Sequence, residues 1–317
     1  MLDKITFPNL GFSLNPSSTA FSVGGFEIKW YGVIIALGFL LAVLYAMKRS
    51  REFGLTQDNI LDLLLIVAPV AIICARAYYV VFSWKDYFGP EATQKFWDIR
   101  SGGLAIYGAV IGAALMILVM ARIKKQKVTP YLDITGLGLL IGQSLGRWGN
   151  FFNREAFGGH TENLFAMQLS LNDAADKITD STALEKLNSF AAKGGYEGFV
   201  RVHPTFFYES VWNLAGFVLI HFLSKKRKFD GQVFLMYLLW YGLGRAWIEG
   251  LRTDSLMMGP LRASQWIALA CVVIAGGLLI FFRIRPIPAE KMYVNCVKAE
   301  EEDLLELMNQ PEKSEEE

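Results

Sequence analysis

Charged side chains lie inside long apolar stretches of this sequence, where a charge is costly and usually marks a functional site. The seven that stand out are Asp62, Arg76, Asp133, Arg147, Glu209, Arg245 and Glu249. For any one of them, a hydrogen bond that only holds two helices together is an equally good explanation. Their grouping along the chain therefore decides between structure and chemistry.

The arginines are grouped with other polar residues at helical spacing. Arg245 and Glu249 are four residues apart, so on a helix they share a face and can pair. Arg147, Asn150 and Arg154 follow an i, i+3, i+7 pattern, which again defines one face. A guanidinium group matches phosphate oxygens two at a time. Arginines that converge in this way predict a site for an anionic phosphate.

Further polar and aromatic residues fall near the same ends of their apolar stretches. Glu209 and Asn213 share a helical face, and His203 lies just before that stretch begins. The other candidates at these ends of the apolar stretches are Tyr31, Arg76, Tyr79 and Arg252.

The composition is that of a membrane protein. Of the 317 residues, 53% are hydrophobic and only 19% are charged, against about 25% charged in an ordinary soluble domain. The 31 basic and 30 acidic residues nearly cancel, which argues against nucleic acid as a partner. A helix needs roughly 20 apolar residues to cross a bilayer. Seven stretches come close to that length, so we expect an all-α integral membrane protein with seven transmembrane helices: residues 30–48, 60–83, 103–121, 131–151, 205–223, 232–249 and 264–283.

Basic residues follow every second stretch and set the expected orientation. Clusters such as Lys48-Arg49 and Lys225-Lys226-Arg227-Lys228 come after the first, third, fifth and seventh stretches. Loops rich in lysine and arginine stay in the cytoplasm. The N-terminus is therefore predicted to lie outside and the C-terminus inside.

This topology divides the chain into parts. Residues 1–29 are predicted to form an extracytoplasmic N-terminal segment, and residues 30–285 a seven-helix transmembrane domain. The polar stretch 154–204, between spans 4 and 5, is too long for a tight connector, so we expect a small extracytoplasmic head there. Residues 286–317 are acidic and predict a solvated, mobile cytoplasmic tail.

Other functional classes explain the pattern less well. With three cysteines and three histidines, the chain has little material for a metal site, and we expect none. The stretch 142–146 fits the G-x-S-x-G nucleophile motif by letter, but it lies in an apolar span with no preceding strand. An intramembrane hydrolase using Ser144 would also need a histidine or lysine at matching depth. A lipid or anion transporter would need polar groups in both halves of the membrane.

The stretch Gly146-Arg147-Trp148-Gly149-Asn150-Phe151-Phe152-Asn153-Arg154-Glu155 resembles the signature G-R-x-G-N-F-x-N-x-E of bacterial prolipoprotein diacylglyceryl transferases. The similarity runs from about residue 30 to residue 285. Five further stretches match that family in the same order: Trp30-Tyr31-Gly32; Ala75-Arg76 with Tyr79; Gly102-Gly103 with Tyr107-Gly108; His203-Pro204 with Tyr208-Glu209; and Tyr241-Gly242-Leu243 with Arg245, Glu249 and Arg252.

This resemblance implies an enzyme of the bacterial cytoplasmic (inner) membrane that carries out the first step of lipoprotein maturation. Its substrates would be phosphatidylglycerol and preprolipoprotein signal peptides that carry a lipobox cysteine. The sn-1,2-diacylglyceryl group would move to the cysteine thiol, forming a thioether and releasing glycerol 1-phosphate. No cofactor and no nucleic acid enter this scheme.

The resemblance also implies roles for individual residues. Arg147 and Arg245 would stabilise the departing phosphate, and Asn150 and Asn153 would orient the headgroup. The glutamates Glu155 and Glu249 would hold the arginines, with Glu209 as further support. Tyr31 would line the lipid-entry side. The expected phosphatidylglycerol-binding set is Arg147, Asn150, Asn153, Glu155, Tyr31, Arg76, Tyr79, Glu209 and Arg252; the expected catalytic set is Arg147, Arg245, Tyr107, His203 and Glu249.

The position of Tyr107 departs from the family pattern. Tyr107 stands where the family usually has a histidine that is assigned as the base for the cysteine thiol. An unperturbed phenol titrates near pH 10 and is a poor base at neutral pH. Three explanations stay open: nearby arginines lower the pKa of Tyr107, His203 takes the proton, or the positive field of the site ionises the thiol without a dedicated base.

Overall fold

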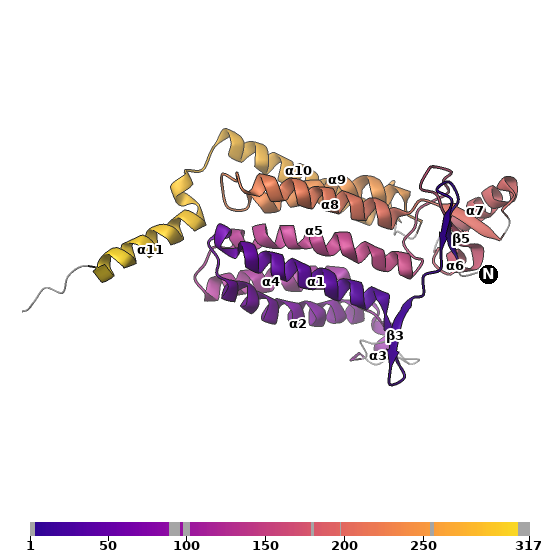
Figure 1. Cartoon of the computed structure of the whole chain (residues 1–317), viewed down its shortest axis with the longest axis horizontal. Coiled ribbons are helices and arrows are strands. Elements are labelled where there is room, and N and C mark those ends of the chain that lie inside the picture. Colours follow the sequence, from indigo (N-terminus) through magenta and orange to yellow (C-terminus); the bar gives the residue numbers. More distant parts are fainter. Residues whose placement is uncertain are drawn as a thin grey trace, which may run out of the picture. The chain divides into compact units, whose positions relative to one another are not determined.

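The computed structural model describes residues 4–88, 96–97, 102–178, 181–196, 198–253 and 257–309 (Figure 1). The chain divides into two compact units. The first unit consists of Met1–Ala42, Gly136–Arg227 and Gln232–Pro286. The second consists of Val43–Thr135, Lys228–Gly231 and Ile287–Glu317.

Each of the seven predicted stretches contains one long helix, and each helix ends within three residues of the predicted limits. These helices are α1 (Trp30–Arg49), α2 (Gln57–Phe82), α4 (Ile106–Ile123), α5 (Val128–Phe152), α8 (Thr205–Ser224), α9 (Gln232–Leu251) and α10 (Ala263–Ile284).

Among the described residues, five helices are long and apolar enough to cross a membrane: α1 with its short 3₁₀ extension η1 (Ser50–Phe53), α2, α4, α8 and α10. The chain is therefore an integral membrane protein with several passes. The helices α5 and α9 fall short because they carry Arg147 and Arg245 with other polar residues. Both are partly enclosed by neighbouring helices: Leu137 and Leu140 of α5 are fully buried, as is Val233 of α9.

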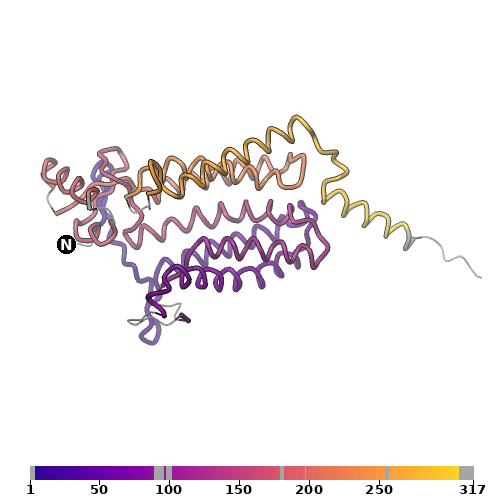
Figure 2. The backbone as a smooth tube through the Cα atoms, turned by 180° about the vertical axis from the view of Figure 1, so that it is seen from behind, coloured from indigo at the N-terminus to yellow at the C-terminus, as the bar shows by residue number. Residues whose placement is uncertain are grey.

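In the first unit, α9 packs against both α8 and α10. Figure 2 shows these three helices running side by side. The short strands β7 (Met257–Met258) and β8 (Leu261–Arg262) pair between α9 and α10.

The head of the first unit contains a sheet, which corrects the expectation of an all-α fold. The antiparallel order is β2-β1-β5-β6, formed by β1 (Ile5–Phe7), β2 (Phe12–Leu14), β5 (Met167–Ser170) and β6 (Phe199–Val202). Its core includes the fully buried side chains Ile5, Leu169, Val200 and Val202. The helices α6 (Leu171–Ala175) and α7 (Ser181–Gly194) lie between β5 and β6 in the sequence.

The sheet also joins two segments that the sequence analysis separated. Thr6 of β1 pairs with Gln168 of β5, so the start of the predicted 1–29 segment belongs to the head. Strands of three or four residues are too short for alternation to reveal them, and their pairing depends on contacts far apart in the chain. The rest of this segment forms the hairpin of β3 (Thr19–Val23) and β4 (Phe26–Lys29).

In the second unit, α2 and α4 pack closely through small residues. A Cβ atom on Gly108 would lie 2.6 Å from Cβ of Tyr78 and 2.9 Å from Cα of Ala75. At Gly112 it would lie 2.7 Å from Cβ of Cys74. The glycines thus allow the helix backbones to approach closely. The short helix α3 (Trp84–Phe88) follows α2.

The C-terminal tail differs from the prediction of a mobile segment. It contains the 3₁₀ turn η2 (Ala289–Lys291) and the helix α11 (Tyr293–Asn309). Its start is fixed in the second unit, because Tyr293 N donates to Oδ2 of Asp230 at 2.7 Å and Lys127 Nζ donates to the Lys291 carbonyl at 2.6 Å. Residues 310–317, the acidic end of the predicted tail, lie outside the described residues.

The close contact of α2 with α4 predicts that Gly108→Ala destabilises the protein. The added methyl group meets backbone atoms of α2, so the helices must separate at a cost of about 1–3 kcal/mol. We expect a lower Tm in detergent. Gly142→Ala is the matched control, because a Cβ atom there has nothing within 4 Å. Equal Tm values for the two variants would contradict the packing argument.

Candidate active site

The carboxylate of Glu209 lies among three arginines. Arg147 Nε of α5 is 2.8 Å from Oε2 of Glu209. From α9, Arg245 Nη1 lies 3.3 Å from both carboxylate oxygens. Arg252 Nη1, just beyond α9, is 3.8 Å from Oε1. One side chain on α8 thus connects cations from two other parts of the chain.

Glu249 provides the second negative charge of this cluster. Its Oε2 lies 2.6 Å from Arg245 Nη2 and 3.9 Å from Arg252 Nε. The pairing of Arg245 with Glu249 across four residues is the one that the sequence predicted. We call the five side chains Arg147, Glu209, Arg245, Glu249 and Arg252 the arginine cluster.

The arginine cluster is positively charged and largely removed from solvent. Its three positive and two negative charges give a net charge of +1. The glutamate side chains are 4–5% exposed, whereas the arginine side chains are 13–21% exposed. The cations thus remain partly accessible while their counterions are enclosed. This arrangement suits a phosphate, which accepts charge-assisted hydrogen bonds from guanidinium groups.

Three predicted site residues, Asn150, Asn153 and Glu155, lie together at the C-terminal end of α5 and in the loop that follows it. Oε1 of Glu155 accepts hydrogen bonds from Nδ2 of Asn150 at 3.0 Å and from Nδ2 of Asn153 at 3.2 Å. Glu155 was expected to hold arginines, but the bonds that the structure gives it here come from two amides. Each amide is oriented by Glu155 through one N–H, and its oxygen and second N–H are the groups that can meet a ligand.

The backbone of this loop is strained. Arg154 and Ala156 have φ values of 51° and 59°, in the left-handed region that only glycine adopts without cost. The side chain of Arg154 turns to the head, where Nη2 donates to the Pro16 carbonyl at 3.2 Å and Nε lies 3.6 Å from Asp173. Strain of this kind persists where surrounding contacts impose it, and it is common at functional sites.

Tyr31 packs directly on the helix that carries Arg147. A Cβ atom on Gly149 would lie 2.5 Å from the ring of Tyr31, so the glycine of the signature provides the space for this ring. The ring of Tyr31 thus packs against α5 at the residue that precedes Asn150 in the sequence.

The position of α5 against α8 is fixed by a reciprocal pair of serines. Ser144 Oγ donates to the Ser210 carbonyl at 2.9 Å, and Ser210 Oγ donates to the Ser144 carbonyl at 2.8 Å. Trp148 Nε1 adds a hydrogen bond to Ser210 Oγ at 3.1 Å. Ser210 directly follows Glu209, and Ser144 precedes Arg147 by one helical turn. Ser144 is therefore a link between helices.

A second reciprocal pair fixes α8 against α9. Trp212 Nε1 donates to the Trp240 carbonyl at 3.0 Å, and Trp240 Nε1 donates to the Trp212 carbonyl at 2.9 Å. Their rings stack with centroids 4.6 Å apart. Trp240 lies over Gly216 and Trp212 over Gly244, and neither glycine leaves room for a side chain. Gly244 is the neighbour of Arg245, so this pair sets the position of Arg245 relative to Glu209.

A short segment of the head connects the ends of α8 and α9. Gly158 N donates to the His203 carbonyl at 2.9 Å, and Gly159 N donates to the Leu251 carbonyl at 2.9 Å. Gly158 also forms an isolated bridge with Arg252. The segment thus places His203 and Arg252 on its two sides.

The His203 side chain has polar neighbours suited to a neutral ring. Its Nδ1 lies 3.4 Å from Tyr208 Oη and 3.5 Å from Asn163 Nδ2. Burial, together with the nearby His160, lowers the pKa of His203 below its usual value of 6.5. His203 is therefore uncharged at neutral pH and can accept a proton.

Three further predicted residues lie in the second unit. Arg76 is 6% exposed and donates to the carbonyls of Phe96, Gly102 and Gly103 at 2.8, 2.8 and 3.0 Å. Its guanidinium group also lies 6.0 Å from the ring centroid of Tyr79. Arg76 was predicted to bind substrate, and the structure shows it holding the loop before α4.

The same loop explains the double glycine of the sequence. Gly102 and Gly103 have φ values of 95° and 75°, and a Cβ atom on Gly103 would lie 2.8 Å from the ring of Tyr79. Tyr107 follows as the second residue of α4, with an exposed ring 6.4 Å from that of Tyr78.

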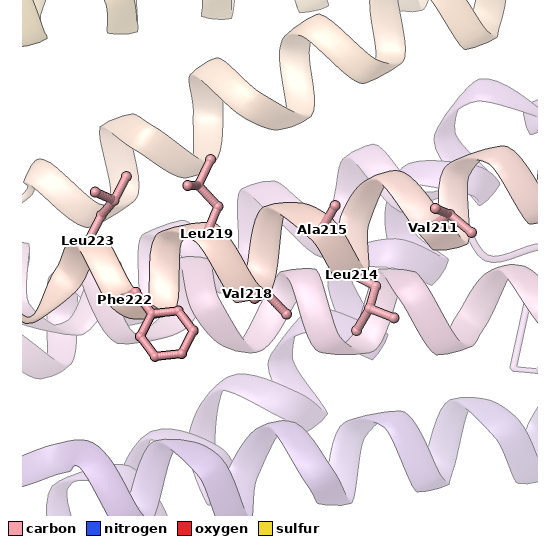
Figure 3. Close-up of a pocket in the computed structure, with 7 residues that line it drawn as sticks. All are labelled: Val211, Leu214, Ala215, Val218, Leu219, Phe222 and Leu223. Carbon is pink, nitrogen blue, oxygen red and sulfur yellow. The ribbon is translucent and has the colours of Figure 1, made fainter.

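A groove of about 540 Å³ runs along another face of α8 (Figure 3). Seven apolar side chains line it, Val211, Leu214, Ala215, Val218, Leu219, Phe222 and Leu223. With no charged or hydrogen-bonding side chain in its lining, this groove cannot hold a phosphate.

Comparison with known proteins identifies the family. A sequence model of the prolipoprotein diacylglyceryl transferase family matches residues 18–281. The chain belongs to this family. It is similar to proteins named phosphatidylglycerol–prolipoprotein diacylglyceryl transferase from Lysinibacillus sphaericus, with 40% identity, and Ligilactobacillus salivarius, with 41% identity, each over 283 residues. These matches cover 89% and 88% of the chain and 97% of each relative.

A relative of the same name from Listeria monocytogenes is 39% identical over 271 residues, which cover 85% of the chain and 91% of the relative. The family assignment made from the sequence motifs is confirmed, and with it the assignment of the chain as a transferase.

Three residues that align the helices of this transferase, Ser210, Trp212 and Trp240, were not among the residues predicted from the sequence. A signal was present for the tryptophans. Each is followed four residues later by a glycine, as Trp212 with Gly216 and Trp240 with Gly244. Two such pairs on neighbouring spans are the pattern expected when each tryptophan lies over the glycine of the other helix.

The tryptophan pair predicts that Gly216→Leu lowers transferase activity more than stability. The larger side chain displaces Trp240 and shifts Arg245 relative to Glu209. If the arginine cluster acts on the substrate, a small displacement of this kind costs about a hundredfold in rate. Activity and Tm of the purified protein are to be compared with those of Gly277→Leu on α10, where a Cβ atom has nothing within 4 Å. A normal rate in Gly216→Leu would refute the positioning role.

Proposed function

We propose that the protein transfers the sn-1,2-diacylglyceryl group of phosphatidylglycerol to the lipobox cysteine of a preprolipoprotein. The observation that carries this proposal is the arginine cluster, with its net charge of +1, whose residues all lie in stretches that match the family. The names of the relatives support the two substrates.

The reaction is a substitution at carbon. The cysteine sulfur forms a bond to the glycerol carbon of the diacylglyceryl group, and the bond from that carbon to the phosphate oxygen breaks. The thiol proton passes to a base or to water, and glycerol 1-phosphate leaves with the electron pair. The negative charge that grows on the leaving phosphate needs fixed cations nearby.

Arg147 and Arg245 are suited to stabilise this leaving group. Both are partly accessible, and both share the carboxylate of Glu209 at 2.8–3.3 Å, so their guanidinium groups are oriented before substrate binds. Glu249 orients Arg245 from its own helix, and Arg252 adds a third positive charge. Preorganised charges of this kind need little rearrangement during the reaction.

The remaining predicted residues have supporting roles in this proposal. The amide oxygens of Asn150 and Asn153, oriented by Glu155, would accept hydrogen bonds from the glycerol hydroxyls of the headgroup. Tyr31, on Gly149, would line the path of the lipid. Arg76 and Tyr79 would hold the Gly102–Gly103 segment in place and so position Tyr107, which follows it.

The proposed membrane arrangement has seven spans, with the N-terminus outside and the C-terminus inside the bacterial cytoplasmic membrane. The seven long helices and the basic residues after every second one support it. In this arrangement residues 30–285 form the catalytic domain. The head, residues 154–204 together with β1 and β2, lies outside, where it would receive the signal peptide.

The phosphate argument predicts the effect of replacing a single arginine. Arg245→Lys should lower transfer from labelled phosphatidylglycerol to a lipobox peptide by about a hundredfold or more, because an ammonium cannot contact Glu209 and a phosphate in the same two-pronged way. Arg201→Lys is the control, since Arg201 pairs with Glu162 in the head. Full activity in Arg245→Lys would overturn this mechanism, and lipid movement without product in the wild type would indicate a transporter.

Which group accepts the proton of the cysteine thiol is tested by measuring transferase activity against pH for the variants Tyr107→Phe and His203→Ala. The lowered pKa of His203 keeps its ring uncharged from alkaline pH down to below 6.5. If His203 accepts the proton, wild-type activity falls only below that pH as the ring gains its charge, and His203→Ala loses this acidic limb together with most of the rate. If Tyr107 is the base, Tyr107→Phe is the inactive variant. Near-normal rates in both variants would favour ionisation by the positive field.

A further inference from the structure

The hairpin of β3 and β4 has one apolar face. Its register pairs Phe21 with Ile28 and Val23 with Phe26. Because side chains alternate along a strand, these four residues lie on the same face. Phe21, Val23 and Phe26 are 52%, 59% and 66% exposed. An exposed apolar face of this kind on a two-stranded element marks a surface that contacts lipid or protein.

The opposite face of the hairpin is polar. Ser22 pairs in register with Glu27, and the Glu27 carboxylate lies 2.5 Å from Lys29 Nζ. Lys29 also donates to Thr19 Oγ1 at 2.9 Å. The hydrogen bond from Lys29 to Glu27 lowers the pKa of the exposed Glu27 carboxyl, and a hydrogen bond from Thr19 and the charge of Lys29 lower it further. The hairpin is thus amphipathic, with a charged face suited to water.

The hairpin is held in a defined orientation. Gly24 and Gly25 both have positive φ values, 56° and 84°, as a tight two-residue turn between strands requires. At the base, Trp30 N donates to the Ser18 carbonyl at 2.9 Å. A few residues earlier, Arg154 binds the Pro16 carbonyl. The apolar face is therefore presented by an ordered element.

The hairpin leads directly into the first helix that can span a membrane. β4 ends at Lys29 and α1 begins at Trp30, so no linker separates them. Four strand residues reach about 13 Å, which keeps the Val23–Phe26 pair close to the end of α1. In Figures 1 and 2 the hairpin turns across the axis of α1 and does not continue it. An element that crosses the axis of a spanning helix at its end lies along the membrane surface.

We propose that the face formed by Phe21, Val23, Phe26 and Ile28 lies in the lipid interface of the membrane. The direct continuation into α1, which is apolar enough to span a bilayer, selects lipid as the occupant. The exposed aromatic rings of Trp30 and Tyr31 fit the same level, because such rings gather at membrane interfaces. The hairpin would fix the depth of the start of α1, and with it the position of Tyr31 on Gly149.

Three consecutive labels test this proposal. Phe21→Cys, Ser22→Cys and Val23→Cys are made in a chain whose native cysteines, Cys74, Cys271 and Cys296, are replaced by alanine. Each variant carries a fluorescent bimane label and is reconstituted into phosphatidylglycerol–phosphatidylethanolamine vesicles. Quenching is measured with nitroxide-labelled lipids, and separately with iodide present on both sides of the membrane.

The proposal predicts an alternating result. Labels at positions 21 and 23 should be quenched by the lipid nitroxides several-fold more than the label at position 22, and iodide should give the reverse order. Similar iodide quenching at all three positions would place the hairpin in water and overturn the proposal. Protection of positions 21 and 23 from both quenchers would also overturn it, because a protein surface would then cover the face.

Discussion

The carboxylate of Glu209 is the group on which the arrangement of this site depends. It lies within 4 Å of Arg147, Arg245 and Arg252, whose charges would repel one another without it. In a partly buried site, removing one partner of such a network leaves uncompensated charge, at a cost of about 3–5 kcal/mol. The cluster nevertheless keeps one positive charge in excess. Glu209 therefore brings the cations together without neutralising them, which is the condition for binding an anion.

Because Glu209 lies on α8, the helices α5 and α9, which carry Arg147 and Arg245, must be positioned relative to α8. The serine link to α5 and the tryptophan link to α9 both start within three residues of Glu209. Each consists of two hydrogen bonds in opposite directions, and each uses backbone carbonyls as acceptors. A helix-to-helix contact made in this way resists both sliding and rotation, so the guanidinium groups meet a carboxylate whose position is already set.

Features set by local rules could be predicted from the sequence. The bilayer requires apolar stretches of a given length, and the helix repeat places Arg245 next to Glu249, so the long helices and this pair were expected. Contacts between distant residues could not be derived. No local pattern shows that Glu209 would receive three arginines, or that Glu155 would bind Asn150 and Asn153. The head sheet and α11 were missed for the same reason, since short strands and an acidic helix depend on partners elsewhere in the chain.

The tryptophan pair also has a consequence for sequence variation. Each indole fills the space left by a glycine on the opposite helix. The side-chain sizes at positions 216 and 240 therefore depend on each other, and so do those at positions 244 and 212. A larger residue at 216 is compatible only with a smaller one at 240, and the same holds for 244 and 212. Among relatives these positions should change as linked pairs or remain unchanged, and an isolated exchange at one of them would mark a chain in which α8 and α9 meet differently.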